Sequence, residues 1–209
     1  MKPDAIATGI AGIVFGLIAG WIIGSQQAAF GTASVSAPAA ASAPASAPAG
    51  GSAAPAAAIL DENKVKALAT VAEQQPNNAQ PRVELGNLYF DSERYSDAIK
   101  WYGEAFKLNP KDVNVSTDLG VSYYYTNQPD RALAQFDESL KIDPKHTKTL
   151  LNVGIVRAFG KQDLQGAEQA WQRVMELDPS GPEGQAAKRA LDSLKSAHPG
   201  GTPAGKPGA

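Results

Sequence analysis

Apolar side chains in residues 59–197 recur at the three- and four-residue spacing of amphipathic helices. Prolines follow several of these segments, at points where a helix cannot continue. The stripes at the two ends of the stretch consist of Val65, Leu68, Ala69 and Ala72, and of Ala187, Ala190, Leu191 and Leu194. This pattern predicts an all-α fold.

The apolar pattern between these end stripes repeats three times, with a period of 34 residues. The first two copies consist of Leu85, Gly86, Tyr89, Ala98, Tyr102, Ala105 and Pro110, and of Leu119, Gly120, Tyr123, Ala132, Phe136, Ser139 and Pro144. The third copy consists of Val153, Gly154, Ala167, Trp171, Val174 and Pro179, with one extra residue between its helices near residues 160–163. Such a period indicates a solenoid of helix-turn-helix units.

The residue types at the repeated positions explain how two helices can pack in each unit. The glycines Gly86, Gly120 and Gly154 allow a partner helix to approach closely, and the alanines do the same from the other side. The aromatic residues fill the wedge between the helices. We therefore expect each unit to be a tightly packed helix pair.

The repeated positions resemble the tetratricopeptide repeat family, whose pattern is W-x₂-L-G-x₂-Y, then A-x₃-F, then P. The chain departs from it at Arg82, Ser116 and Leu150, where the family has Trp, and at Arg157, where it has Tyr. The departures weaken individual repeats without changing the architecture. The resemblance implies a partial repeat at 59–78, full repeats at 79–112, 113–146 and 147–181, and a capping helix at 182–197.

An uncharged apolar run of about 19 residues near the amino terminus is long enough to cross a hydrocarbon core roughly 30 Å thick. We expect a transmembrane signal anchor over residues 5–24, with residues 1–4 in the cytoplasm, because Lys2 precedes the run and no Lys or Arg follows before Lys64. The expected location is the cytoplasmic (inner) membrane, with the repeats facing the periplasm or cell exterior. Cleavage after Ala33, which would release a soluble binder, is the alternative.

The segments on either side of the repeats lack the side chains that build a core. Residues 25–58 are rich in Ala, Pro and Ser, and residues 198–209 are rich in Gly and Pro. We expect the first segment to be a disordered linker that holds the repeats away from the membrane, and the second to be a disordered tail.

Four glycines of the apolar run recur every four residues and would therefore lie on one face of a helix. They are Gly12, Gly16, Gly20 and Gly24. Such a stripe favours self-association, and a homo-oligomer built through the span and the repeats is one alternative for the function. The other interpretation is that glycine is simply common in membrane helices.

Composition excludes most kinds of chemistry. The chain has no cysteine and two histidines, His146 and His198, neither of them in a predicted pocket. No nucleophile-base pair, metal-ligand cluster or phosphate-binding loop is present, so we expect no catalytic residues, no metal and no cofactor. With a net charge of −2, the chain is also a poor candidate for binding nucleic acid.

The resemblance implies a binding groove lined by the first helix of each repeat. The positions it assigns to the groove are Val83, Asn87 and Phe90, then Thr117, Val121 and Tyr124, then Lys148, Leu151 and Ile155. Only Asn87 and Lys148 match the Lys, Arg and Asn clamp with which some family members grip a peptide carboxylate, so that mode is not expected. Phe90, Val121 and Tyr124, with the two apolar residues of the third repeat, predict instead an exposed apolar strip.

These observations together predict a membrane-anchored adaptor that binds other proteins outside the cytoplasm. The expected partner is a protein or peptide with an apolar or amphipathic segment. By resemblance to anchored proteins with such repeats, the expected process is assembly of an envelope or secreted complex.

Overall fold

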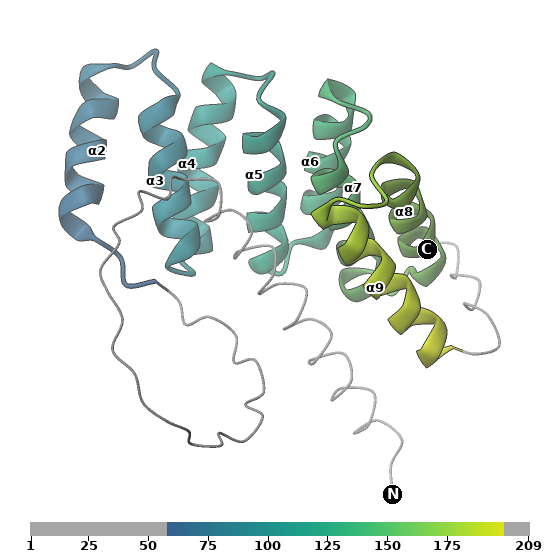
Figure 1. Ribbon diagram of the computed structural model, residues 1–209. Coiled ribbons are helices and arrows are strands. Elements are labelled where there is room, and N and C mark those ends of the chain that lie inside the picture. Colours follow the sequence, from purple (N-terminus) through teal and green to yellow (C-terminus); the bar gives the residue numbers. More distant parts are fainter. Residues whose placement is uncertain (1–57, 199–209) are drawn as a thin grey trace, which may run out of the picture. The chain divides into compact units, whose positions relative to one another are not determined.

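A computed structural model describes residues 58–198, which form eight α-helices and no strand. Successive helices lie side by side (Figure 1). The helices are α2 (Glu62–Gln74), α3 (Gln80–Asp91), α4 (Tyr95–Leu108), α5 (Val113–Tyr125), α6 (Pro129–Ile142), α7 (Thr147–Ile155), α8 (Leu164–Leu177) and α9 (Pro182–Ala197). The prediction of an all-α helical solenoid is confirmed.

No helix within residues 58–198 is long and apolar enough to cross a membrane. The predicted span at 5–24 with its glycine stripe, most of the predicted linker, and most of the predicted tail lie outside the described residues. Their assignments stay predictions.

Acidic side chains mark several helix boundaries, as their positions beside turns suggested. The Asp61 Oδ1 atom accepts backbone N–H groups at 3.0 Å in the first turn of α2, and Asp112 does the same at 3.1 Å in α5. Asp143 and Asp178 accept backbone N–H groups of the loops that follow α6 and α8. These side chains satisfy backbone donors that the helices leave unpaired.

Within each full repeat, an aromatic ring of the second helix lies directly against a glycine of the first. A β-carbon at Gly86 would lie 2.5 Å from the Tyr102 ring, and one at Gly120 or Gly154 would overlap an aromatic ring in the same way. The rings at these two positions are Phe136 and Trp171. All three rings are almost completely buried, so the contact sets the distance between the paired helices.

Two departures from the family pattern are polar side chains, the part-buried Arg82 and the fully buried Ser116, and both are hydrogen-bonded. The Arg82 guanidinium donates to the carbonyl oxygens of Ala72 and Asn78 at 3.1 and 2.9 Å, which joins α3 to α2. The Ser116 Oγ accepts hydrogen bonds from Ser139 and Gln135, each at 2.8 Å. Hydrogen bonds thus replace the apolar contacts that a tryptophan would make.

The extra residue of the third repeat lies in a different place from the one predicted. We expected it in the turn near residues 160–163, but the chain absorbs it in a π-helical turn, η1 (Val156–Gly160), at the end of α7. The Lys161 N–H donates to the Val156 carbonyl oxygen at 3.1 Å, one residue farther back than in an α-helix. A π-turn adds one residue without breaking the helix, which a spacing argument does not reveal.

The turn after this insertion keeps the geometry of the other repeats. The backbone N–H groups of Arg94 and Gln128 donate to the carbonyl oxygens five residues earlier, at 2.8 and 2.9 Å. The N–H group of Asp163 donates to the carbonyl oxygen six residues earlier, at 2.8 Å. The residue before each donor has a positive φ of 56–58°. The insertion is therefore contained within η1, and α8 begins in the same relation to α7 as α4 does to α3.

The last helix, α9, covers the end of the array by packing against α8 and α7 (Figure 1). Its buried side includes Ala187, Ala190, Leu191 and Leu194. Its other side is exposed and carries an ion pair between Lys188 and Asp192 at 2.8 Å. This arrangement is what a capping helix requires.

Removing residues 182–197 should lower the melting temperature of the array. Burial of the Leu191 and Leu194 side chains alone stabilises the fold by about 3 kcal/mol or more, and the truncation removes this contribution. Thermal unfolding followed by circular dichroism of the chain with and without this segment measures the effect. The matched control, Lys188→Ala with Asp192→Ala, removes only the exposed ion pair and should change stability by less than about 0.5 kcal/mol. Equal melting temperatures for the truncated and intact chains would refute the capping role.

Candidate functional site

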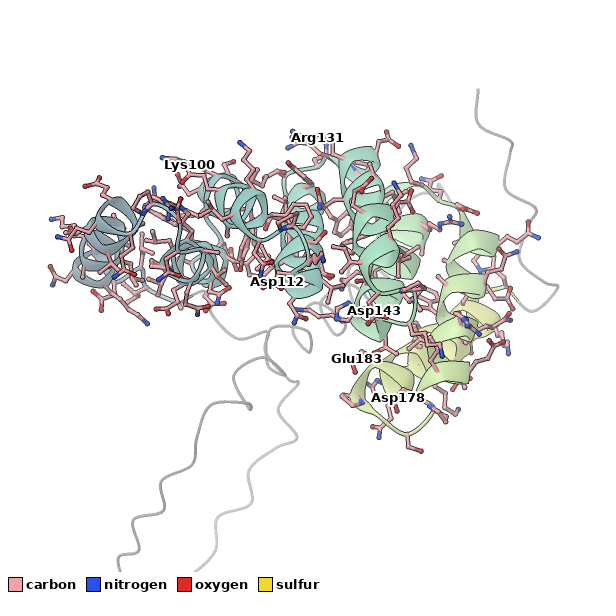
Figure 2. All side chains as sticks on the ribbon, turned by 90° about the horizontal axis from the view of Figure 1, so that it is seen from above. Lys100, Asp112, Arg131, Asp143, Asp178 and Glu183 are labelled. Carbon is pink, nitrogen blue, oxygen red and sulfur yellow. The ribbon has the colours of Figure 1, made fainter. Side chains whose placement is uncertain are left out.

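The predicted groove residues all lie on α3, α5 and α7, the first helices of the three repeats. We call the surface that these helices present the inner face. Figure 2 shows Asp112, Asp143 and Glu183 on one side of the array, and Lys100 of α4 and Arg131 of α6 on the opposite side. The second helices thus form a separate outer surface.

The expectation of an exposed apolar strip on the inner face is wrong for four of its five residues. Phe90 and Val121 keep only 7% and 4% of their surface exposed, and Leu151 and Ile155 only 1% and 5%. Phe90 packs against the rings of Tyr95 and Tyr125, and α5 packs mainly against α4 and α6. The apolar side chains of α7 are buried because α7 packs mainly against α8, with α6 and α9 beside it. Tyr124 is the member of the strip that remains half-exposed.

The predicted polar positions of the inner face are engaged in specific contacts. Asn87 is exposed, and its side-chain oxygen accepts a hydrogen bond from the Tyr102 hydroxyl at 2.7 Å. The Lys148 ammonium donates to Asp118 at 2.8 Å across the gap between α7 and α5. Val83 is partly exposed on α3. Whether these residues contact a partner stays a prediction.

Thr117, the remaining predicted position, is fully buried in a hydrogen-bonded cluster between α5 and α7. Its hydroxyl lies 2.7 Å from the Thr149 hydroxyl, which lies 2.6 Å from the His146 Nδ1 atom. His146, which was expected to lie outside any predicted pocket, directly precedes α7 and joins this cluster. Thr117 therefore ties two first helices together and faces no solvent.

The sequence analysis did not identify two carboxylates near the inner face, those of Asp91 and Asp118. Asp91, at the end of α3, is half-buried, and its pKa is raised by burial and by the nearby charge of Asp118, against a smaller opposite effect of Lys64. Burial raises the Tyr102 pKa well above its usual value, and both carboxylates raise it further. The signal available in the sequence was the four-residue spacing of Asn87 and Asp91, which places both on one side of α3.

An aromatic cluster lies where α3 and α5 end. The rings of Tyr95 and Tyr125 are stacked with centroids 4.5 Å apart, and Phe90 meets both rings edge-on at 5.2 and 5.8 Å. Burial, with the nearby Glu93, raises the Tyr95 pKa to about 12. Tyr95 and Tyr125 are partly exposed, whereas Phe90 is buried.

Metal chemistry finds no support in the described part of the chain. Residues 58–198 contain no group of three or more His, Asp or Glu side chains placed to hold a metal ion.

The array should lose stability between about pH 7.5 and pH 5 partly through His146. Burial, and then the charge of Lys148, lower its pKa below the ordinary 6.5, against the opposing effects of Asp143, Asp118 and Glu183. A lowered pKa means that the unfolded chain binds the proton more readily, so stability falls as the pH drops below about 6.5. Urea unfolding at both pH values should show a larger loss for the natural chain than for His146→Gln, and equal losses would contradict the assignment.

Comparisons with known proteins agree with this geometry. A family model described as TPR repeat matches residues 86–127, and one described as Tetratricopeptide repeat matches residues 115–146. A search of curated protein sequences finds no match. The matched regions cover α4, α5 and α6 and the second half of α3.

Several solved structures are similar to the described array. The first TPR of Spaghetti (RPAP3), bound to the HSP90 peptide SRMEEVD, is 26% identical over 57% of this chain and 94% of its own, with a TM-score of 0.52. The first TPR domain of human RPAP3 is 26% identical over 58% and 93%, with a TM-score of 0.53. The crystal structure of MamA, 15% identical over 63% and 85% with a TM-score of 0.54, shares the fold. Residues 86–146 therefore match models of tetratricopeptide repeats, and the folded part of this chain is an all-α helical solenoid with the fold of the TPR structures.

Proposed function

We propose that the array is a protein-binding scaffold that holds a segment of a partner protein against its inner face. The observation that carries this proposal is the set of half-exposed and exposed side chains on α3 and α5. These helices pack mainly against α2, α4, α6 and the edge of α7, which leaves Asn87, Asp91 and Tyr124 at the surface. A row of polar and aromatic side chains on a rigid support is typical of peptide recognition.

The comparison structures support the same kind of function. The RPAP3 domain, 26% identical to this chain, was solved with a peptide. The hydroxyl of the first helices that lies next to a possible base, that of Thr149 at 2.6 Å from the His146 Nδ1 atom, is fully buried and also lies 2.7 Å from the Thr117 hydroxyl. We infer a role in binding without catalysis.

We further propose that the predicted span at 5–24 anchors the scaffold in the cytoplasmic membrane, with the linker carrying the repeats on the periplasmic or outer side. The support is the length of the uncharged run and the absence of Lys or Arg between it and Lys64. A role in assembling an envelope or secreted complex would follow from that location. The intact mass of the membrane-bound protein checks this part, and a mature chain that begins at Ser34 would overturn it.

Site-specific photo-crosslinking in the full chain tests the binding face. A photoreactive amino acid at the exposed inner positions Gln80 and Asn114 should capture a partner. The same group at Lys100 and Arg131, exposed on the opposite side of the array, should capture less. All four positions are exposed, so the replacements should leave the melting temperature nearly unchanged.

The crosslinked products are compared by mass spectrometry on intact membranes. One partner enriched from both inner positions and depleted from both outer positions is the expected result. Equal capture from the two surfaces, or preferential capture from the outer positions, contradicts the proposed face. Crosslinks between copies of the chain alone would instead show the homo-oligomer.

A further inference from the structure

Two buried threonine hydroxyls lie between α5 and α7, next to a half-buried imidazole. Thr117 and Thr149 are both completely buried, and their hydroxyl oxygens lie 2.7 Å apart. The His146 Nδ1 atom lies 2.6 Å from the Thr149 oxygen. At the other end, the Thr117 oxygen lies 2.7 Å from the carbonyl oxygen of Val113. These polar groups form an unbroken chain from the start of α7 to the start of α5.

The number of protons in this chain gives it a direction. A carbonyl oxygen can only accept, so the Thr117 hydroxyl donates its one proton to Val113. Thr117 must therefore accept the proton of Thr149. Thr149 then has no proton left for the imidazole, so the His146 Nδ1 atom carries a proton and donates it to Thr149.

A chain of donors in the opposite direction is unfavourable. With Thr149 donating to the imidazole and Thr117 donating to Thr149, no proton would lie between the oxygens of Thr117 and Val113, which are 2.7 Å apart. Two unprotonated oxygens at that distance repel each other, and Thr117 is completely buried, so no solvent water separates them. The neutral imidazole therefore carries its proton on Nδ1.

We propose that a one-way hydrogen-bond relay runs from the His146 Nδ1–H group through the two threonine hydroxyls to the Val113 carbonyl oxygen, and that it ties α7 to α5 in both protonation states of the imidazole. In the neutral ring the lone pair lies on Nε2, which makes no hydrogen bond within residues 58–198. Acid adds a proton there and leaves the Nδ1–H donor in place. The relay needs no partner, so it stands independently of the proposed function.

Charged groups on the neighbouring elements act on the imidazole without reversing the relay. Burial and then Lys148 of α7 lower the pKa of His146. Three carboxylates raise it, those of Asp143 after α6, Asp118 of α5 and Glu183 of α9. These groups determine how readily the ring takes up the second proton. Because that proton is added outside the relay, acid costs stability through a buried charge and not through a lost hydrogen bond.

The relay also distinguishes the two junctions between repeats. Thr117 and Thr149 correspond, 34 residues earlier, to Val83 and Val115, so the junction of α3 with α5 lacks these hydroxyls. The junction of α5 with α7 is tied twice, by the relay and by the 2.8 Å ion pair between the same two helices. The third repeat is therefore held on the second at neutral and acidic pH. Valine at the equivalent positions also makes Thr→Val the natural replacement for a test.

Nitrogen NMR of the imidazoles, in the full chain in detergent, tests the direction of the relay. The chain has two histidines, so His146→Gln identifies the resonances of His146. At pH 7.5 its Nδ1 atom should give the signal of a protonated nitrogen and its Nε2 atom that of an unprotonated one, and acid should then change the Nε2 signal. The reverse assignment at pH 7.5 would overturn the proposal, and this result needs no variant of the relay itself.

The variant Thr149→Val removes the acceptor of the imidazole proton and keeps the shape of the side chain. Hydrogen bonds from a charged donor are stronger than those from a neutral one, so the relay favours the protonated ring and its loss should lower the titration midpoint of His146. A relay in the reverse direction would be broken by protonation, so the same variant would then raise the midpoint. An unchanged midpoint would show that the Thr149 hydroxyl does not bond the imidazole, which also overturns the proposal.

Urea unfolding measures how strongly the relay ties the two helices. Thr149→Val should raise the unfolding equilibrium constant about fivefold or more at pH 7.5, and by at least the same factor at one pH unit below the midpoint of His146, as for the loss of a buried hydrogen bond. The matched control is Thr70→Val, at an exposed position of α2 where the hydroxyl donates to a carbonyl of its own helix, and it should change the constant by no more than about twofold. A cost of Thr149→Val that disappears at the acidic pH would contradict a relay that survives protonation.

Discussion

The architecture of this array depends on one contact, the face of an aromatic ring against a glycine of the paired helix. Tyr102, Phe136 and Trp171 occupy this position in the three repeats, where no β-carbon could fit. Because core packing is dense, the contact fixes how closely the two helices approach. Repeating it every 34 residues, or 35 where η1 is inserted, stacks the helix pairs into a solenoid.

The other features of the fold adjust to this spacing. The part-buried Arg82 and the fully buried Ser116 stand where the family has tryptophan, and each is hydrogen-bonded to a neighbouring helix. The π-helical turn takes up the extra residue before the loop begins, so Trp171 still reaches Gly154. Keeping the pairs in register places α3, α5 and α7 on one face, where Lys148 of α7 pairs with Asp118 of α5, 30 residues earlier in the sequence.

The sequence predicted the helix pairs because the spacing of glycine, alanine and aromatic residues directly reflects contacts within one repeat. The sequence could not predict that Leu151 and Val121 are buried, because their burial depends on how closely one repeat packs on the next. Asp91 was not identified because its raised pKa depends on burial and on the nearby charge of Asp118, which lies on another helix. The position of the extra residue was missed because a π-turn and a longer loop give the same spacing.

The most direct test of this account is a double-mutant cycle that couples Gly120 to Phe136. Gly120→Ala should cost about 1–3 kcal/mol of unfolding free energy through overpacking, whereas Gly103→Ala, which meets nothing within 4 Å, should be neutral or slightly stabilising. In a Phe136→Leu background, where the ring is gone, most of the Gly120→Ala cost should disappear, giving a coupling energy of about 1 kcal/mol or more. Strictly additive costs in urea unfolding would show that the ring does not set the helix spacing, and would contradict the account.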